Sequence, residues 1–456
     1  MSAVDTSTRT DLRRAVLLIA LSLTFGLVQF DATVVNVALN AVRDQLGGGV
    51  EAAQWLVDAY AVPFAACMLA AGALGDRFGH RLACVLGFVI FGLASLAAAV
   101  ATGWTLLITA RAVQGVGAAI MLPASLALIG RLYPDQRQRS RALGIWGGVA
   151  TAGFASGPIA GGLLIKSAGW PAIFWLNLPV AAVVGAVIGA LAPGERRSNR
   201  RPDLAGTVLA IAGLAGLTAG IIESVRSVAL GVVLIIGGIV TGVLFVVVQR
   251  HRAEPLVPGA LLRPPAFRWA LVTGLIFNFS MYGSLLCVSL TLQTAYCFAP
   301  IRAGLAVLPL ALVVSVGATS SGFLVARLGP RPPMITGFCS AVTGLVIIAI
   351  GALAAHPAVI IIGLTVCGLI SLAMPAMTSV ALDAAPLAHA GFASGSLNTA
   401  RQLGGALGVA LLGALLNQGG YRTGFGTAVL AAAVITAFGL LSSFRATRRG
   451  METWQG

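Results

Sequence analysis

The chain has 456 residues and a formal net charge of +15 at pH 7, and 58% of its residues are hydrophobic while 9% are charged. Soluble domains carry roughly 25% charged residues, so this composition excludes a water-soluble enzyme or binding protein and indicates a polytopic membrane protein. Nucleic-acid binding is excluded as well, because the basic residues lie in short groups between apolar segments and form no continuous basic surface.

Apolar segments that are long enough to cross a bilayer follow one another along the chain. A membrane-spanning helix needs about 20 mostly apolar residues. The first segment is too long for a signal-peptide core and no small-residue cleavage site follows it, so we expect it to remain as a helix. The predicted fold class is an all-α polytopic membrane protein with fourteen spans, at residues 15–38, 53–73, 82–101, 104–125, 142–165, 173–191, 204–222, 228–248, 269–291, 303–325, 333–354, 357–379, 391–416 and 425–444.

The distribution of basic residues predicts the orientation of these spans. With an even number of spans, both termini lie on one side of the membrane, and most arginines fall on that side. Short cytoplasmic loops carry the excess of arginine and lysine, so we expect both termini in the cytoplasm and the protein in a bacterial cytoplasmic (inner) membrane. The opposite side holds Arg43, Lys166, Arg226, Arg302 and Arg422.

Two loops of the chain repeat at an offset of 250 residues. The matching residues are Gly72 and Gly322, Arg77 and Arg327, Gly79 and Gly329, and Arg81 and Arg331. One loop follows the second span and the other follows the tenth, so spans one to six correspond to spans nine to fourteen. Two such halves in a membrane are typical of alternating-access transporters.

The repeat gives the expected domain organisation. An N-terminal six-helix bundle covers 1–192 and a C-terminal six-helix bundle covers 269–444. Spans seven and eight form an inserted pair. The remaining parts are an arginine-rich cytoplasmic linker at 193–203, the inserted pair at 204–250, a second cytoplasmic linker at 251–268 and a cytoplasmic tail at 445–456.

Four motifs on these spans carry a family resemblance. They are Phe30 to Leu39 in the first span, Gly72 to Arg81 after the second, Arg111 to Gly117 in the fourth, and Gly153 to Gly162 in the fifth. Together and in this order, they make the chain resemble the major facilitator superfamily, specifically its fourteen-helix drug:proton antiporters. The resemblance implies two six-helix bundles with two extra central helices and export driven by a proton gradient, with no cofactor.

Ionisable residues inside predicted spans are functional candidates, because burying a charge in a bilayer is costly. Asp31 lies about 24 Å along the first span at 1.5 Å per residue, and Arg111 and Asp58 fall at a similar depth on their own spans. Asp31 and Arg111 form either a structural pair or a pair that protonation breaks during transport. The resemblance implies proton coupling for both positions, and we prefer that interpretation. We expect Asp58 to take part in proton coupling together with Asp31 and Arg111.

Two interpretations also fit Asp58 as a substrate-binding residue. It is either an interfacial acid close to water or a membrane carboxylate that, beside aromatic residues, holds a lipophilic cation. Some cation exporters of the resembled family carry an acid here, which favours the second interpretation.

Two groups of residues are expected to act in gating. The loop group is Gly72, Asp76, Arg77, Gly79 and Arg81, where the resemblance implies that Asp76 pairs with arginines and with a neighbouring helix N-terminus. The second group is Gly153, Gly157, Pro158 and Gly161 in the fifth span. These glycines are spaced by four residues and line one helix face, which permits close helix contact. In relatives, this motif distinguishes exporters from symporters.

Further substrate-binding residues are expected among polar and aromatic side chains of the cavity-lining spans. They are Asn36, Tyr60, Gln114, Asn278, Tyr282, Gln293 and Asn398. Arg401, near the midplane of the thirteenth span, snorkels, caps a neighbouring helix or meets an anionic substrate group; the sequence leaves these alternatives open.

The predicted function is a proton-coupled exporter of lipophilic or amphipathic drugs, cations included. The alternative is a dedicated self-resistance exporter for one antibiotic or metabolite, anionic or neutral. No enzymatic activity, cofactor or metal is expected, because the histidines fall in loops or at span ends and the cysteines have no metal-ligand spacing. The expected partners are a small hydrophobic substrate, protons and the lipid bilayer, with no nucleic acid, and a monomer is expected.

Overall fold

The computed structural model describes residues 3–47, 50–194, 203–224, 226–252, 255–257, 259–298, 300–416 and 421–447. These residues fold into helices, with no strand among them, and fourteen segments are long and apolar enough to cross a membrane. The all-α fold class and the number of spans are therefore confirmed. Most of the predicted 193–203 linker and of the 445–456 tail lies outside the described residues.

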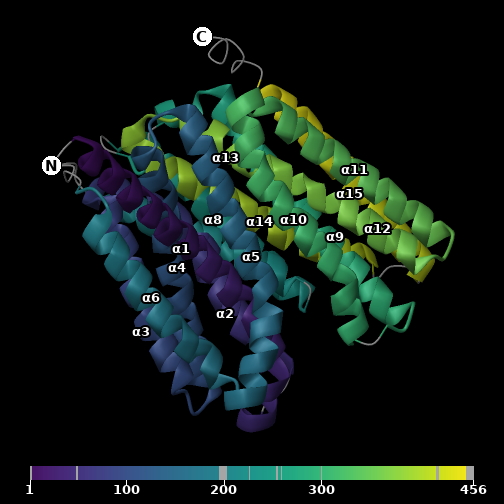
Figure 1. Cartoon of the computed structure of the whole chain (residues 1–456). Coiled ribbons are helices and arrows are strands. Elements are labelled where there is room, and N and C mark those ends of the chain that lie inside the picture. The colour runs from purple at the N-terminus through teal and green to yellow at the C-terminus, as the bar shows by residue number, and fades with distance from the viewer. Residues whose placement is uncertain are drawn as a thin grey trace.

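Two bundles of helices diverge from a shared end in Figure 1. The first bundle consists of α1 (Ala3–Leu46), α2 (Val50–Phe78), α3 (His80–Ala99), α4 (Trp104–Leu132), α5 (Gln136–Ala168) and α6 (Pro171–Leu191). The second consists of α9 (Pro265–Thr294), α10 (Pro300–Leu328), α11 (Arg331–Leu353), α12 (Pro357–Cys367), α13 (Ala373–Asp383), α14 (Ala390–Leu416) and α15 (Tyr421–Ala446). The short 3-10 turn η1 (Gly259–Leu262) precedes α9, and η3 (Leu387–His389) connects α13 to α14.

The predicted twelfth span is interrupted near its middle. A 3-10 segment, η2 (Gly368–Leu372), separates α12 from α13, although all three lie in one membrane-spanning stretch. The hydroxyl of Ser321 on α10 donates a hydrogen bond to the carbonyl oxygen of Leu372 at 2.5 Å, which supplies a partner at the point where the regular helix changes. A neighbouring side chain satisfies the backbone here, as a broken helix in a membrane requires.

The shared end is formed by the loops after α2, α4 and α10, and we call it the arginine-rich end. Gly72 of α2 packs against the backbone of Gly391 at the start of α14. Its repeat counterpart, Gly322 of α10, packs against Gly144 of α5. Each half thus places its second helix against the fifth helix of the other half, which is the contact pattern of two halves related by a pseudo-two-fold axis.

The repeated loop turns also share a backbone conformation. Gly79 has a φ of 100° and Gly329 a φ of 81°. These values lie where residues with a Cβ are disfavoured, so glycine is needed at both turns. The repeat in the sequence therefore reflects a shared tight turn at the arginine-rich end.

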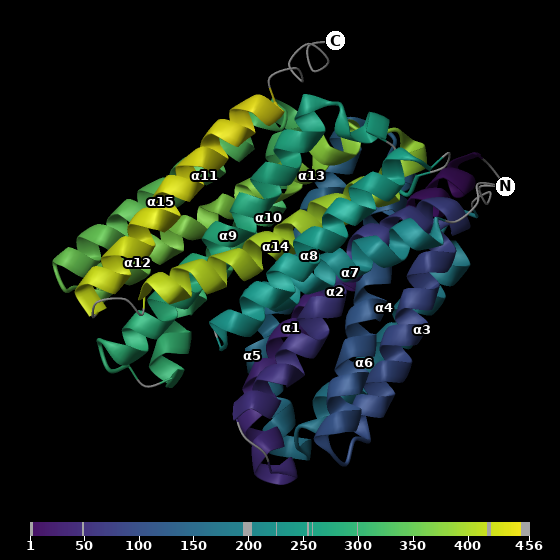
Figure 2. The ribbon, with the colours of Figure 1, turned by 180° about the vertical axis from the view of Figure 1, so that it is seen from behind.

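The inserted pair α7 (Leu204–Glu223) and α8 (Val228–Arg250) forms a hairpin beside the two bundles. α7 packs against α2 and α14, one helix from each half, and Figure 2 shows the hairpin in front of them. The base of the hairpin is closed by Asp203, which accepts hydrogen bonds from Gly206 and Leu256 backbone N–H groups at 2.8 and 3.3 Å and from the Gln249 side chain. Burial alone would raise the pKa of Asp203, but these hydrogen bonds and the nearby Arg252 charge lower it.

Candidate functional site

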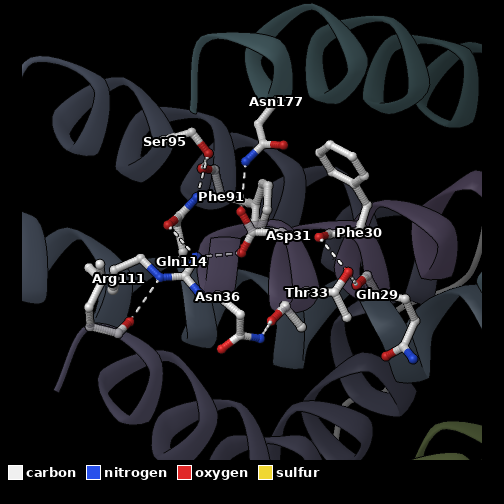
Figure 3. A network of polar contacts seen from close by, with 12 residues as sticks. Gln29, Phe30, Asp31, Thr33, Asn36, Phe91, Ser95, Arg111, Gln114 and Asn177 are labelled. Carbon is white, nitrogen blue, oxygen red and sulfur yellow. Dashed lines mark hydrogen bonds and ion pairs between the residues drawn. The ribbon is translucent and has the colours of Figure 1, made fainter. Parts of the chain in front are cut away.

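A buried ion pair lies inside the first bundle, and Figure 3 shows its surroundings. The guanidinium of Arg111 on α4 donates to one carboxylate oxygen of Asp31 on α1, and the side chains are 1% and 0% exposed. The amide of Asn177 on α6 donates to the other oxygen of Asp31 at 2.8 Å. Both oxygens of this carboxylate therefore have donors, and the charge of each partner is balanced where water has little access.

A second set of contacts fixes the guanidinium of Arg111. It donates to the side-chain oxygen of Gln114 at 3.0 Å, and Gln114 in turn donates to the hydroxyl of Ser95 on α3 at 2.7 Å. From α2, the carbonyl oxygen of Leu56 accepts from Nε at 3.3 Å, and the ring of Tyr60 lies 4.3 Å from the guanidinium carbon. Every helix of the first bundle except α5 thus contributes a side chain or carbonyl to the network.

The ion pair joins two helices, so a loss of its negative charge would affect how these helices pack. If Asp31 takes up a proton, the ion pair is lost and Arg111 stays buried among neutral groups. A buried charge without its partner costs about 3–5 kcal/mol, so protonation would favour a rearrangement that gives the guanidinium a new partner. The ion pair is therefore a charged joint between α1 and α4 inside the first half.

Asp58 of α2 lies outside this network. Its carboxylate forms an ion pair with Arg226 in the turn between α7 and α8, and Arg226 also pairs with Glu223, with 3.1 Å between Nη1 and Oε2. The sequence placed Asp58 and Arg111 at similar depths, but depth does not fix which way a residue faces around its helix. The structure turns Asp58 toward the inserted hairpin and Tyr60 toward Arg111.

Asp76 joins the two halves at the arginine-rich end. Its two carboxylate oxygens accept from the backbone N–H groups of Gly391 and Phe392, each at 2.8 Å, at the start of α14. A helix N-terminus favours an anion because its first N–H groups have no partner within the helix. His80, which is buried, places Nε2 3.1 Å from the same carboxylate. The second half has Ala326 at the equivalent position, so this arrangement is not repeated there.

The other loop residues of the gating group lie around this contact. The guanidinium of Arg77 lies 5.1 Å from the ring of its neighbour Phe78. Arg81 donates to the carbonyl oxygen of Ala192 at 3.4 Å, within the first half. The direct link to the second half comes from Asp76 and from the close approach of Gly72 to Gly391.

A further ion pair joins the halves at the same end. Arg139 near the start of α5 pairs with Asp383 at the end of α13, and Gln136 donates to the same carboxylate at 2.8 Å. The side chains of the ion pair are 13% and 24% exposed. These contacts, together with those of Asp76, join the two halves at the arginine-rich end.

The predicted glycine face of α5 packs on α1. A Cβ at Gly153 would lie 2.9 Å from the Cα atom of Gly26, and one at Gly157 would lie 3.0 Å from the Cβ atom of Thr33. Thr33 also donates to the carbonyl oxygen of Phe154 at 3.1 Å. Gly161 packs against Val34, and α5 continues through Pro158 as one helix. The motif therefore sets the distance between α5 and α1, the helix that carries Asp31.

Gly153→Ala should destabilise the protein by about 1–3 kcal/mol, because the added methyl group meets backbone atoms that cannot rotate away. Thermal unfolding of the purified protein in detergent measures this effect. Gly162→Ala is the matched control, since a Cβ there has no atom within 4 Å. Equal stability of the two variants would contradict the assignment of Gly153 to a close helix contact.

A second buried guanidinium lies in the second half. Arg401 of α14 is 7% exposed, and its Nε and Nη1 donate to the side-chain oxygens of Asn278 at 3.4 Å and Asn398 at 3.3 Å. Its Nη2 lies 3.4 Å from the sulfur of Met374, and its guanidinium carbon lies 5.5 Å from the ring of Phe277. Each of these partners is neutral, in contrast to the Asp31 partner of Arg111.

The other predicted substrate-binding residues lie in different places. Tyr282 is half-buried and faces Phe154 of the first half, with 6.5 Å between ring centroids. Asn36 is exposed and its amide donates to the carbonyl oxygen of Ala32, one turn earlier on α1. Gln293 is exposed near the end of α9 and bonds to Ser289. The structure does not bring these three residues together.

Several residues of these networks escaped the sequence reasoning. Asn177 lies in the predicted sixth span and was not named as a candidate, although a side-chain amide inside a span indicates a hydrogen bond to a neighbouring helix. Arg226 has Glu223 three residues before it, a spacing that favours an ion pair. His80, one of the histidines placed in loops or at span ends, lies beside Asp76 four residues before it. Asp383 was not named as a candidate, and its partner Arg139 lies 244 positions earlier in the chain.

Among the described residues, no group of three or more histidine, cysteine, aspartate or glutamate side chains is arranged to hold a metal ion.

Comparisons with known proteins agree with this architecture. The sequence pattern of the Major Facilitator Superfamily matches residues 21–409. The multidrug resistance protein Stp of Mycobacterium tuberculosis is 34% identical over 88% of this chain and 75% of its own length. The methylenomycin A resistance protein of Streptomyces coelicolor is 33% identical over 97% and 94%. In fold, the human organic anion transporter MFSD10 has a TM-score of 0.71 at 15% identity, over 94% of this chain and 99% of its own. The chain belongs to the major facilitator superfamily of membrane transporters.

Proposed function

We propose that the protein is a proton-coupled antiporter that exports lipophilic or amphipathic drugs, cations included, by alternating access. The observation that carries the proposal is the Asp31–Arg111 pair, buried inside one half and bridging two of its helices. Proton uptake there changes the charge balance between α1 and α4, and α1 packs along its length on α5. The names of the relatives, which are multidrug and antibiotic resistance proteins, support export as the direction.

The conformation fits one state of such a cycle. Asp76 and Arg139 join the halves at the arginine-rich end, and the bundles diverge toward the other end (Figure 1). We place the arginine-rich end, with both chain ends, in the cytoplasm of a bacterial cell and the protein in its inner membrane, because basic residues accumulate on the cytoplasmic side. The state is then closed to the cytoplasm, the state from which an exporter releases its substrate outward.

The test is substrate-evoked proton movement in liposomes. We expect that the reconstituted protein, with a pH-sensitive dye trapped inside, responds to hydrophobic compounds from a panel of cationic, neutral and anionic members. Protein-free liposomes with the same panel provide the control. Uptake or release of a compound without any change in internal pH would contradict proton antiport.

A second candidate is a dedicated exporter for one anionic antibiotic or metabolite. Arg401 favours it, because its guanidinium is buried and donates to the neutral side chains of Asn278 and Asn398. An anionic group of a substrate would supply the negative charge that balances this guanidinium. A response confined to anionic members of the panel would favour this candidate over a general drug exporter.

A further inference from the structure

Three charged side chains connect the tip of the α7–α8 hairpin to the first half, at the end opposite the arginine-rich end. Arg226 stands in the turn between α7 and α8 and forms ion pairs with Asp58 of α2 and Glu223 of α7. The side chain of Arg226 is 21% exposed and each carboxylate is 16% exposed. The cluster is therefore within reach of solutes and yet partly shielded from water.

An aromatic ring completes this cluster. Trp55, one turn before Asp58 on α2, has its ring centre 5.8 Å from the guanidinium carbon of Arg226. A carboxylate beside an aromatic face is the combination that holds an organic cation, through charge and through the quadrupole of the ring. Arg226 thus fills, with its own side chain, a site of the kind that binds a lipophilic cation.

The charges of the cluster allow a bound cation to replace Arg226 beside Asp58. There are two carboxylates for one guanidinium, so the cluster carries an excess of negative charge when all three groups are ionised. Glu223 lies on the same hairpin as Arg226 and stays beside it wherever the hairpin tip moves. A cation that takes Asp58 therefore leaves Arg226 paired with Glu223, and the cost of a charge without a partner is avoided.

We propose that Arg226 is a tethered counter-ion that competes with cationic substrates for Asp58 and so sets the charge preference of the transporter. The inference deepens the proposed export function and rests on it. It also assigns a role to the inserted helix pair, since α7 packs against both halves and its tip is fastened to α2 by the same ion pair. Binding of a cation at Asp58 would break the Asp58–Arg226 ion pair and free the hairpin tip from α2.

Equilibrium binding of tetraphenylphosphonium, a lipophilic monovalent cation, to the purified full-length protein tests the proposal. Arg226→Gln should bind it about two- to fivefold more tightly than the wild type, the gain expected when a partly exposed competing ion pair is removed. Adding Asp58→Asn to that variant should abolish the gain. Glu223→Gln should weaken binding, because Arg226 then has Asp58 as its remaining carboxylate in the cluster.

Arg302→Gln is the matched control. Arg302 is an exposed arginine on α10 at the same end of the molecule, so its removal changes the surface charge equally without touching the cluster. Unchanged affinity in Arg226→Gln, or an equal gain in Arg302→Gln, would overturn the proposal. Because the expected result is tighter binding, a misfolded variant cannot imitate it, and Glu223→Gln gives an independent answer if Arg226→Gln fails to fold.

The experiment separates this inference from the proposed function. Binding at equilibrium needs no proton gradient, so the affinities of the variants test the role of Arg226 independently of proton antiport. A wild-type protein that moves no protons with any compound would contradict antiport. The binding affinities would still show whether Arg226 competes with the cation for Asp58.

Discussion

Asp31→Asn is expected to reduce substrate-evoked proton movement in liposomes to the level of protein-free liposomes. Asparagine has the shape of the aspartate and still accepts a hydrogen bond, but it neither carries the negative charge nor takes up a proton. The pair with Arg111 is then lost in a place where the two side chains are at most 1% exposed. The joint between α1 and α4 would no longer respond to pH, and transport would lose its driving force.

The same variant should also be less stable, because it leaves Arg111 charged and buried. Breaking a buried ion pair by removing one partner costs about 3–5 kcal/mol. Loss of transport could then follow from unfolding, so a second variant is needed. Asp31→Asn combined with Arg111→Gln removes both charges and should recover much of the stability.

The double variant gives the decisive comparison. It should resemble the wild type in thermal unfolding and still show no proton movement, since both groups of the joint are neutral. Proton-coupled transport at the wild-type rate in either variant would contradict the role of Asp31. Recovery of transport together with recovery of stability would show that the pair is structural, which is the alternative that the sequence left open.

The sequence predicted the spans and the depth of the charges, but it could not predict how helices face each other. Fourteen apolar segments are sufficient to count the spans, and a constant rise per residue places Asp31 and Arg111 at one level. The rotation of α2, which turns Tyr60 toward Arg111 and Asp58 toward Arg226, depends on the packing of α7 against it. The Asp58–Arg226 pair joins residues that lie 168 positions apart in the sequence.

The loop repeat illustrates the same limit at the arginine-rich end. Glycine at 79 and 329 was visible as a repeat, and its cause is a shared positive φ. The family resemblance implied that Asp76 contacts the N-terminus of a neighbouring helix, but it did not say which helix. The identity of that helix, α14, follows from the pseudo-two-fold arrangement of the halves, which no local pattern specifies.

Asp76→Asn should open the arginine-rich end. In the wild type, both oxygens of the carboxylate accept backbone N–H groups of α14 across the interface between halves. The amide retains one acceptor oxygen and presents an NH₂ group to the other N–H donor. Loss of one hydrogen bond to a charged group costs about 1.5–3 kcal/mol, so the ratio of closed to open molecules should fall by at least about tenfold.

Distances between spin labels on the two halves measure this change. Leu12 of α1 and Leu328 of α10 are exposed, with 66% and 60% of their surface accessible, and both lie toward the arginine-rich end. Labelled cysteines at these positions, in a variant whose six native cysteines are alanine, should show longer distances when Asp76→Asn is present. The control is Asp135→Asn, because Asp135 caps α5 within its own half and accepts from the Gln138 N–H at 2.8 Å. An unchanged distance distribution in Asp76→Asn would contradict the role of Asp76 in closing the arginine-rich end.

The effect should be larger for Asp76 than for Asp383, the other acid that joins the halves. Asp383 and Arg139 are 24% and 13% exposed, and ion pairs in contact with water contribute about 0–1 kcal/mol. Asp76 instead binds N–H groups that would otherwise have no partner at a helix N-terminus, and Ala326 provides no carboxylate at the equivalent place in the second half. Asp383→Asn should therefore shift the label distances little, while Asp76→Asn removes the contact on which closure mainly depends.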